Sequence, residues 1–169
     1  MQSAGDNENL NYVAYWQSPV GLVEVVGDDI AVHSVLFVEE KRREQTGTLS
    51  DTVKECVKQL SEYFDGRRRD FDLSMAQKGT DFQQRVWTEL MNIPFGKTVS
   101  YMQMAKALGD PKCIRAAGTA NGKNQIAVIV PCHRVVGANG TLVGYAGGLN
   151  RKRWLLEHEA KMSGVMRLL

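Results

Sequence analysis

The chain has 169 residues, 43% of them hydrophobic, which suits one compact domain or two small domains that share a core. No apolar run approaches the roughly 18 residues that a membrane span needs. Residues 1–11 are polar, without the basic-then-apolar order of a signal peptide, and three cysteines without paired spacing argue against a disulfide framework or a zinc finger. We expect a solvated amino-terminal tail and a reducing compartment, the cytoplasm, or the nucleus if the source is eukaryotic.

Charge is unevenly divided along the chain, although the net charge is only +2. Residues 1–79 hold nine Lys and Arg against fourteen Asp and Glu, a balance of −5, whereas residues 80–169 hold twelve against five, a balance of +7. Such a split predicts that the second half faces a polyanion while the first half is a solvated support. An uneven surface without a partner is the alternative that charge alone leaves open.

The first half begins with extended structure. Runs of β-forming residues separated by turn residues predict an antiparallel meander of three strands, at residues 12–16, 22–26 and 30–38. His33 falls inside the third strand, where a packed or surface histidine is expected instead of a catalytic one.

A helix follows this meander. Ser50 or Asp51 can cap it, and apolar residues then recur at helical spacing as far as Phe64. Cys56 lies on that apolar stripe, so we expect it in the core. The arginines at residues 67–69 end the segment and are expected to form a solvated loop.

The second half is predicted to be mostly helical, after a seam at residues 76–80. A capping box at residues 80–83 begins its first helix. Two short helices, at about residues 100–109 and 112–121, are joined by a tight turn that contains glycine, which is typical of a helix-turn-helix. Residues 151–162 form the last predicted helix.

Cys132 follows an apolar, β-branched run at residues 125–130, which predicts a buried strand or extended segment that holds the thiol rigidly. A free thiol, with a pKa of about 8.5, needs a base or a positive charge to become a nucleophile at neutral pH. His133 is the nearest base, but neighbouring side chains of an extended segment point to opposite faces, so a bridging water is the expected link. Glu157 and Glu159 are the candidates to orient the imidazole, and spacing does not choose between them.

The pentapeptide Pro131-Cys132-His133-Arg134-Val135 resembles the active-site motif of the O6-alkylguanine-DNA alkyltransferases, the methylated-DNA–protein-cysteine methyltransferases. The resemblance extends in order from about residue 80 to 160. It includes Val99-Ser100-Tyr101, Arg115-Ala116-Ala117-Gly118, Asn124, Gly144-Tyr145-Ala146-Gly147-Gly148-Leu149 and Trp154-Leu155-Leu156-Glu157-His158-Glu159. The first half is similar only in outline to the ribonuclease-H-like subdomain of these proteins.

This resemblance implies an α+β fold in two parts. Residues 1–79 would form a ribonuclease-H-like subdomain, with a three-stranded antiparallel sheet and a helix. Residues 80–169 would form a mostly helical domain for DNA binding and alkyl transfer, which carries the helix-turn-helix and the active-site cysteine.

The resemblance also implies a catalytic group of five residues. Cys132 would be the acceptor nucleophile, His133 its base through a water, and Glu159 the residue that orients His133. Asn124 would brace the turn between the recognition helix and the active-site segment. Tyr101 would donate to N3 of the departing guanine and crowd the 3′ phosphate, and such a proton donation is typically worth about 10²–10⁴-fold in rate.

Further residues are implied to contact the DNA. Arg115 would act as a finger that fills the gap in the base stack when the lesion is flipped out. The small residues Ala116, Ala117 and Gly118 would let the helix pair approach the minor groove closely.

The remaining implied contacts hold the flipped base. The Val135 carbonyl would accept from the guanine amino group, and Tyr145 would wall the pocket. Ala146 would offer its backbone N–H to O6, and Gly147 belongs to the same substrate-binding segment. Some relatives carry serine at position 146, but a backbone donor does not need the hydroxyl.

The implied function is DNA repair by direct reversal, in which an alkyl group moves from O6-alkylguanine in double-stranded DNA to Cys132. The thioether product resists simple hydrolysis, so one molecule should repair one lesion, as a single-turnover, suicide enzyme. O4-alkylthymine as a second substrate and cooperative binding along DNA stay open. We expect a monomer without a cofactor and without a metal site, because Cys56 and His33 show no ligand spacing.

Three alternatives are weighed against this function. An alkyltransferase-like protein would recognise the lesion without transfer, but such proteins lack the cysteine. A Cys-His-Glu hydrolase or acyltransferase could build an oxyanion hole at Gly147-Gly148, but it would leave the basic half and the helix-turn-helix unexplained. A transcription factor would need side chains for major-groove readout, and the second helix of the pair carries few.

Overall fold

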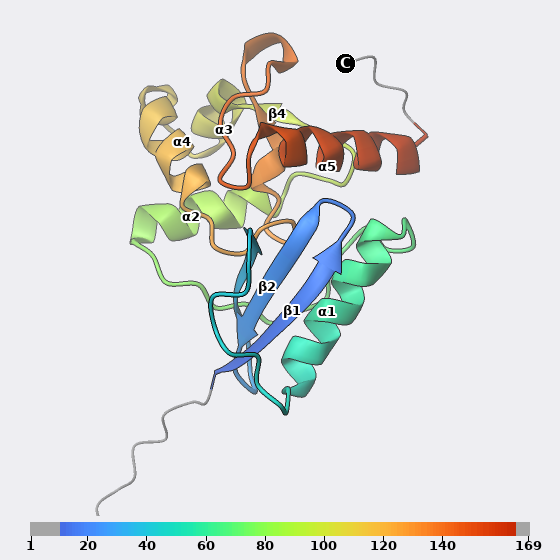
Figure 1. The fold of residues 1–169 in the computed structure, drawn as a ribbon. Helices are drawn as coiled ribbons and strands as arrows, with labels where there is room; N and C mark the ends of the chain where they lie inside the picture. Colours follow the sequence, from blue (N-terminus) through green and yellow to red (C-terminus); the bar gives the residue numbers. More distant parts are fainter. Residues whose placement is uncertain (1–10, 165–169) are drawn as a thin grey trace, which may run out of the picture.

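The computed structural model describes residues 11–164, so the predicted tail at residues 1–11 lies outside the described part except for its last residue. A three-stranded sheet with one helix against it is followed by a mostly helical part (Figure 1). The predicted α+β fold class is therefore confirmed. Within residues 11–164, none of the helices combines the length and the apolar character that crossing a bilayer would require.

The sheet is a simple antiparallel meander in the order β1-β2-β3. Its strands are β1 (Tyr12–Ser18), β2 (Gly21–Gly27) and β3 (Val32–Val38). The turn between β2 and β3 is closed by Asp28, whose Oδ1 accepts from the backbone N–H groups of Ile30 at 2.7 Å and Ala31 at 2.8 Å. His33 is half-buried and pairs with Asp28 at 2.9 Å, which fits the packed histidine predicted there.

The outer edge of β3 is covered by two later segments of the chain. Met75 and Ile126 form parallel bridges with Val32 and Val35. The second bridge is made by Val35 N donating to Gln125 O at 2.9 Å and Ala127 N donating to Val35 O at 2.9 Å. The segment that leads to Cys132 is therefore hydrogen-bonded to the sheet of the first half.

Helix α1 (Asp51–Phe64) packs against this sheet. Ser50 and not Asp51 is its cap, because the Ser50 hydroxyl accepts from Val53 N at 3.2 Å. Cys56 is fully buried on the inner face, as predicted. In the loop after α1, Arg67 and Arg69 are exposed, in agreement with the predicted solvated loop.

The second part is built from helices and two very short strands. Thr80 caps α2 with the predicted capping box, and Ser100 caps α3 in the same way. The elements are α2 (Asp81–Leu90), β4 (Val99–Ser100), α3 (Tyr101–Ala107), η1 (Pro111–Cys113), α4 (Ile114–Gly122), η2 (Cys132–Arg134), β5 (Val135–Val136), η3 (Ala138–Gly140) and α5 (Leu149–Met162). Helices α3 and α4 form the predicted pair.

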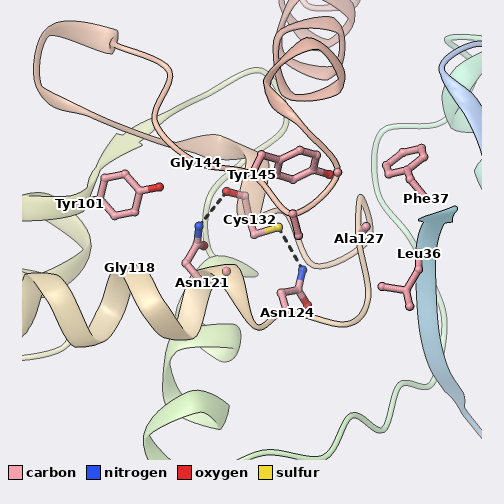
Figure 2. A pocket seen from close by; sticks show the side chains of 13 residues that line it. Leu36, Phe37, Tyr101, Gly118, Asn121, Asn124, Ala127, Cys132, Gly144 and Tyr145 are labelled. Carbon is pink, nitrogen blue, oxygen red and sulfur yellow. Dashed lines mark hydrogen bonds between the residues drawn. The ribbon is translucent and has the colours of Figure 1, made fainter. Parts of the chain in front are cut away.

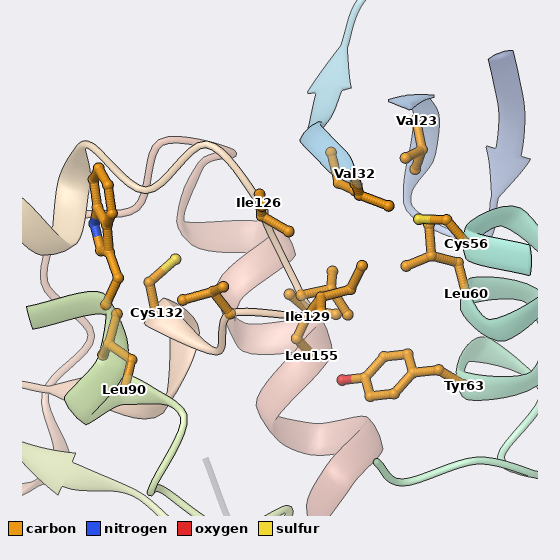
Figure 3. Close-up of a cluster of buried hydrophobic side chains, with 14 of the residues drawn as sticks. Val23, Val32, Cys56, Leu60, Tyr63, Leu90, Ile126, Ile129, Cys132 and Leu155 are labelled. Atoms are coloured by element: carbon orange, nitrogen blue, oxygen red, sulfur yellow. The ribbon is translucent and has the colours of Figure 1, made fainter. Parts of the chain in front are cut away.

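One hydrophobic core runs through both parts. Figure 3 shows Val32 and Leu60 of the first part on one side of the cluster and Ile126, Ile129 and Leu155 of the second part on the other. Because this cluster is continuous, the division between residues 79 and 80 stays a prediction.

Residues 125–130 differ from the strand or extended segment that their composition predicts. Only Ile126 pairs with a strand, and the chain then turns back on itself, with Val130 N donating to Ile126 O at 3.1 Å and Ile129 N to Ala127 O at 2.8 Å. Val128 has a φ of 70°, which is rare for a β-branched residue. These residues are apolar because they form a buried tight turn. Their composition therefore led to the wrong prediction of a strand or extended segment.

Candidate active site

A pocket of about 160 Å³ opens beside Cys132. Besides the segment that carries Cys132, its walls come from three places: Tyr101 and Gly118 of the helix pair, the segment 144–147, and Leu36 and Phe37 of β3. Figure 2 shows Tyr101 on one side of Cys132 and Phe37 on the other, with Tyr145 between them. The first half of the chain thus supplies part of the pocket wall, which the sequence did not indicate.

Cys132 is only 6% exposed and lies in the short turn η2, directly after the apolar segment. Its Sγ accepts from Asn124 Nδ2 at 3.3 Å, and its carbonyl accepts from Asn121 Nδ2 at 3.3 Å (Figure 2). Burial raises the pKa of the Cys132 thiol, while the Asn124 amide and the charge of Lys152 act in the opposite direction. At neutral pH the buried sulfur therefore keeps its proton until a base removes it.

Asn124 joins the end of α4 to the segment that carries Cys132. Its Nδ2 also donates to Val130 O at 2.9 Å and Ile126 O at 3.2 Å, and its Oδ1 accepts from Ile126 N at 3.1 Å. Gln77 Nε2 donates to the same Oδ1 at 3.0 Å. This is the geometry that the predicted brace requires, and Asn121 is a second brace that the sequence did not single out.

His133 is paired with Glu159 inside the protein. His133 Nε2 and Glu159 Oε2 are 2.7 Å apart, and both side chains are buried. Burial favours the neutral carboxyl, but the contacts with His133 and Arg134 outweigh it and hold the pKa of Glu159 well below its usual range. The structure therefore places an ionised Glu159 beside His133, whereas Glu157 is exposed.

This pairing fixes the tautomer of His133. An ionised carboxylate only accepts hydrogen bonds, so the Nε2 atom must carry the proton that faces Glu159. Burial lowers the pKa of His133, which keeps the ring neutral near pH 7. The other ring nitrogen, Nδ1, then has a lone pair, and within residues 11–164 no protein atom hydrogen-bonds to it.

Arg134 balances the charge of Glu159. Its Nε and NH2 groups donate to Oε1 at 2.8 Å and to Oε2 at 3.1 Å, and its NH1 group donates to Ile93 O at 2.7 Å. Such a two-point contact holds the carboxylate in one orientation. The motif contains Arg134, but its place in the motif did not indicate this contact.

Lys152 is a buried charge that no sequence motif singled out. Its Nζ donates to the carbonyls of Val135 at 2.7 Å, Val143 at 3.1 Å and Gly144 at 3.1 Å. Burial lowers its pKa to about 8, and the nearby Cys132 acts in the opposite direction. A signal existed, because Lys152 and Glu159 are seven residues apart and so lie on the same buried face of α5.

The same contact involves Val135, whose carbonyl is predicted to accept from the guanine amino group. Its carbonyl accepts from Lys152 within β5, its side chain is fully buried, and it does not line the pocket. A carbonyl oxygen can accept a second hydrogen bond, so the predicted contact with a guanine amino group stays a prediction.

The predicted DNA contacts divide between surface and core. Arg115 and Ala116 are exposed on α4, and Gly118 lines the pocket. Ala117 is fully buried in the core, so its predicted contact with DNA is wrong. Helix periodicity explains the error, because consecutive residues of a helix point in different directions. Tyr101 is half-buried, and its hydroxyl donates to Val143 O at 3.1 Å.

Tyr145, Ala146 and Gly147 line the pocket together. A Cβ atom on Gly147 would approach the Tyr145 ring to 2.9 Å and the Phe37 ring to 3.1 Å, so only glycine lets this segment lie against both rings. The Tyr145 hydroxyl is buried, and no protein atom within residues 11–164 hydrogen-bonds to it.

Charged side chains outside the pocket favour an anionic partner. Lys106, Lys112, Arg115 and Lys123 are exposed along the helix pair, against one exposed acid, Asp110. Such a basic surface is typical of binding to a phosphate backbone. In the described part of the chain, no three His, Cys, Asp or Glu side chains cluster in a way that could hold a metal ion.

Comparison with known protein families accounts for both parts of the chain. Residues 11–77 match the family described as 6-O-methylguanine DNA methyltransferase, ribonuclease-like domain. Residues 81–161 match the family described as 6-O-methylguanine DNA methyltransferase, DNA binding domain.

Individual relatives agree with these matches. The methylated-DNA–protein-cysteine methyltransferase of Methanosarcina acetivorans is 43% identical over 88% of this chain and 97% of its own length. The protein of that name from Mycobacterium bovis is 46% identical over 84% of this chain and 88% of its own. The crystal structure of the Mycobacterium tuberculosis enzyme in complex with DNA is similar with a TM-score of 0.82 and 43% identity, over 89% of this chain and 94% of that one. The chain therefore belongs to the methylated-DNA–protein-cysteine methyltransferase family.

Proposed function

We propose that the protein repairs DNA by moving one alkyl group, typically methyl, from O6 of a flipped-out guanine to Sγ of Cys132. One observation carries this proposal: Cys132 lines a pocket while the next residue, His133, is a neutral imidazole held by an ionised Glu159. The names of the relatives supply the reaction class, and the pocket explains why the base has to leave the duplex.

The first step is removal of the thiol proton. Because Nε2 of His133 faces Glu159, the base is Nδ1, and a water molecule passes the proton from Cys132 Sγ to it. The imidazolium that forms is stabilised by the Glu159 carboxylate. Asn124, which donates to Sγ, stabilises the thiolate in a pocket where burial alone would disfavour it.

The second step is displacement at the alkyl carbon. A bond forms between Sγ and this carbon while the bond between the carbon and O6 breaks, and the electron pair stays on guanine. The backbone N–H of Ala146 donates to O6, and Tyr101 gives its phenolic proton to N3 of the leaving base. For this the Tyr101 hydroxyl leaves the Val143 carbonyl, to which it donates in the structure.

The DNA is bound through the helix pair at the minor groove. Arg115 and Gly118 are three residues apart on α4 and share a face, so Arg115 lies at the mouth of the pocket. From there its side chain fills the space that the flipped base leaves, while Gly118 lets the strand approach. Lys106, Lys112 and Lys123 neutralise phosphates on either side.

The thioether on Cys132 has no leaving group for water to displace, so each molecule acts once, as a monomer, on one lesion. No step described above uses a metal or an organic cofactor.

Mass spectrometry tests this proposal directly. Incubation of the protein with excess duplex DNA that contains one O6-methylguanine should add one methyl group to each protein molecule, on the peptide that contains Cys132. An unmodified duplex is the control. Absence of the adduct, an adduct on another residue, or several lesions repaired by each molecule would contradict the proposal.

A further inference from the structure

The Glu159 carboxylate is shared by donors from three segments of the chain. Oε2 accepts from the Tyr63 hydroxyl at 2.6 Å, in addition to His133 Nε2 at 2.7 Å and the Arg134 NH2 group at 3.1 Å. Oε1 accepts from Arg134 Nε at 2.8 Å and from Gly96 N at 3.2 Å. Tyr63 differs from the other donors because it lies on α1, 96 residues before Glu159 and in the ribonuclease-like part of the chain.

Tyr63 is held rigidly in this position. It is fully buried, and its ring packs edge-on against Phe95 and His158, with centroids 6.0 Å and 5.1 Å away. Its carbonyl is 2.7 Å from His158 Nε2, so α5 contacts both its backbone and its side chain. Figure 3 shows the side chain reaching from α1 toward the helix that carries Leu155, with the hydroxyl foremost.

A short hydrogen bond from a phenol to a carboxylate changes the chemistry of that carboxylate. The Tyr63 proton withdraws charge from Oε2, the atom that faces His133. A carboxylate with less charge on this oxygen stabilises the imidazolium less, so the hydroxyl acts on the proton affinity of His133 without touching it.

We propose that Tyr63 is a positioning residue of the alkyl-transfer reaction, through which the ribonuclease-like domain sets the orientation and the basicity of His133. This inference rests on the proposed function. It gives the first domain a part in the reaction that its fold and its acidic composition do not suggest.

The other charged groups around His133 come from the second part of the chain. Burial lowers the pKa of His133, Glu159 raises it, and Arg134 and Lys152 lower it further. The buried groups Cys132 and Tyr145 lie near the same cluster, and both face the pocket. Tyr63 is the residue of α1 that reaches this cluster. Removing its hydroxyl therefore changes one contribution to the pKa of His133 and leaves the others in place.

Tyr63→Phe tests the proposal, because phenylalanine keeps the ring packing and deletes only the hydroxyl. Single-turnover rates of methyl transfer are measured from pH 5 to pH 9 with the methylated duplex. The variant should show its acid inflection roughly one pH unit higher, because a hydrogen bond to a charged group and a one-unit pKa shift are similar in free energy. Its rate then falls up to about tenfold near pH 5 and changes little near pH 8.

Tyr15→Phe is the matched control. The Tyr15 hydroxyl donates to the buried carboxylate of Glu24 at 2.8 Å, so this variant loses the same kind of bond at a distance from the pocket. It should leave the pH profile unchanged. Replacing Tyr63 with 3-fluorotyrosine keeps the ring, makes the hydroxyl a stronger donor and should move the inflection to lower pH.

The outcomes separate this inference from the proposed function. If the wild-type protein transfers the methyl group and both Tyr63 variants keep its acid inflection, only the role of Tyr63 is overturned. The same holds if Tyr63→Phe lowers the rate equally at every pH. No methyl transfer by the wild-type protein overturns both. If Tyr63→Phe fails to fold, the 3-fluorotyrosine variant decides.

Discussion

Cys56 and Cys132 occupy two buried regions that differ in what surrounds the sulfur. Both side chains are almost inaccessible, with 0% and 6% exposure. Around Cys56, burial alone acts and raises the pKa of the thiol to about 12. Around Cys132, burial also raises the pKa, but Asn124, Lys152 and backbone N–H groups oppose it. Burial therefore does not distinguish an inert cysteine from a reactive one, whereas polar neighbours and a pocket do.

The largest expected effect separates the two thiols. Cys132→Ser should abolish methyl transfer, because a serine hydroxyl in the same place is far harder to deprotonate than a thiol. Cys56→Ser should retain transfer and instead lose about 1–3 kcal/mol of unfolding free energy, because a hydroxyl costs more to bury in this apolar core than a thiol does. Transfer is measured by intact mass and stability by urea unfolding. Methyl transfer by Cys132→Ser, or loss of transfer in Cys56→Ser, would contradict the distinction between a reactive Cys132 and an inert Cys56.

The second prediction concerns a substitution that removes a charged group near Cys132, so that its surroundings become more apolar, like those of Cys56. Glu159→Gln removes the charge that stabilises the imidazolium, so the single-turnover rate should fall by about 10²-fold or more. Because Arg134 then lacks its buried partner, the unfolding free energy should also fall by about 3–5 kcal/mol.

Glu157→Gln is the control for this change, since Glu157 lies on the same helix with its side chain exposed. It should alter the rate and the stability little. Equal effects of the two substitutions would show that the loss comes from the charge of α5 and not from the contact between Glu159 and His133.

The smallest expected effect concerns pH. The folded protein keeps the Cys56 proton up to a pKa of about 12, whereas an unfolded thiol loses its proton near pH 9.0. The stability that this difference contributes is fully present below pH 9 and is lost as the pH rises toward 12. Compared with Cys56→Ala, the wild-type protein should therefore lose about 1 kcal/mol more unfolding free energy between pH 9 and pH 10.

Urea unfolding at pH 8, 9 and 10 measures this difference. Val53→Ala, on the same buried face of α1, is the matched control, because it opens a cavity without removing a titrating group. Its deficit relative to the wild-type protein should be the same at each pH. A pH-independent difference for Cys56→Ala would contradict the pKa assigned to Cys56.

Local patterns in the sequence predicted most of the fold. The three strands, α1 and the capping box at Thr80 were correct because alternation and caps are encoded within a few residues. The turn after Ile126 was missed, because apolar β-branched residues are equally suited to a strand and to a buried loop. The helix pair was recognised, but the burial of Ala117 depends on how α4 packs.

The candidate site was predictable as far as its motif extends. Cys132 and His133 are adjacent in sequence, so the resemblance identified them together. The choice between Glu157 and Glu159 required the rotation of α5 about its axis, which only packing determines. The contact of Tyr63 spans 96 residues and leaves no trace in periodicity or spacing.

The pairing of Val35 with residues 125–127 has a consequence for dividing the chain. A fragment cut near residue 79 would retain the meander and α1, yet the peptide groups of β3 that now bond to Gln125 and Ala127 would be bare. An unpaired strand edge recruits strands from other molecules, so this fragment should aggregate when it is made separately. The segment that leads to Cys132 therefore also protects this strand edge, and we expect the two predicted domains to stay in solution only when they are made as one chain.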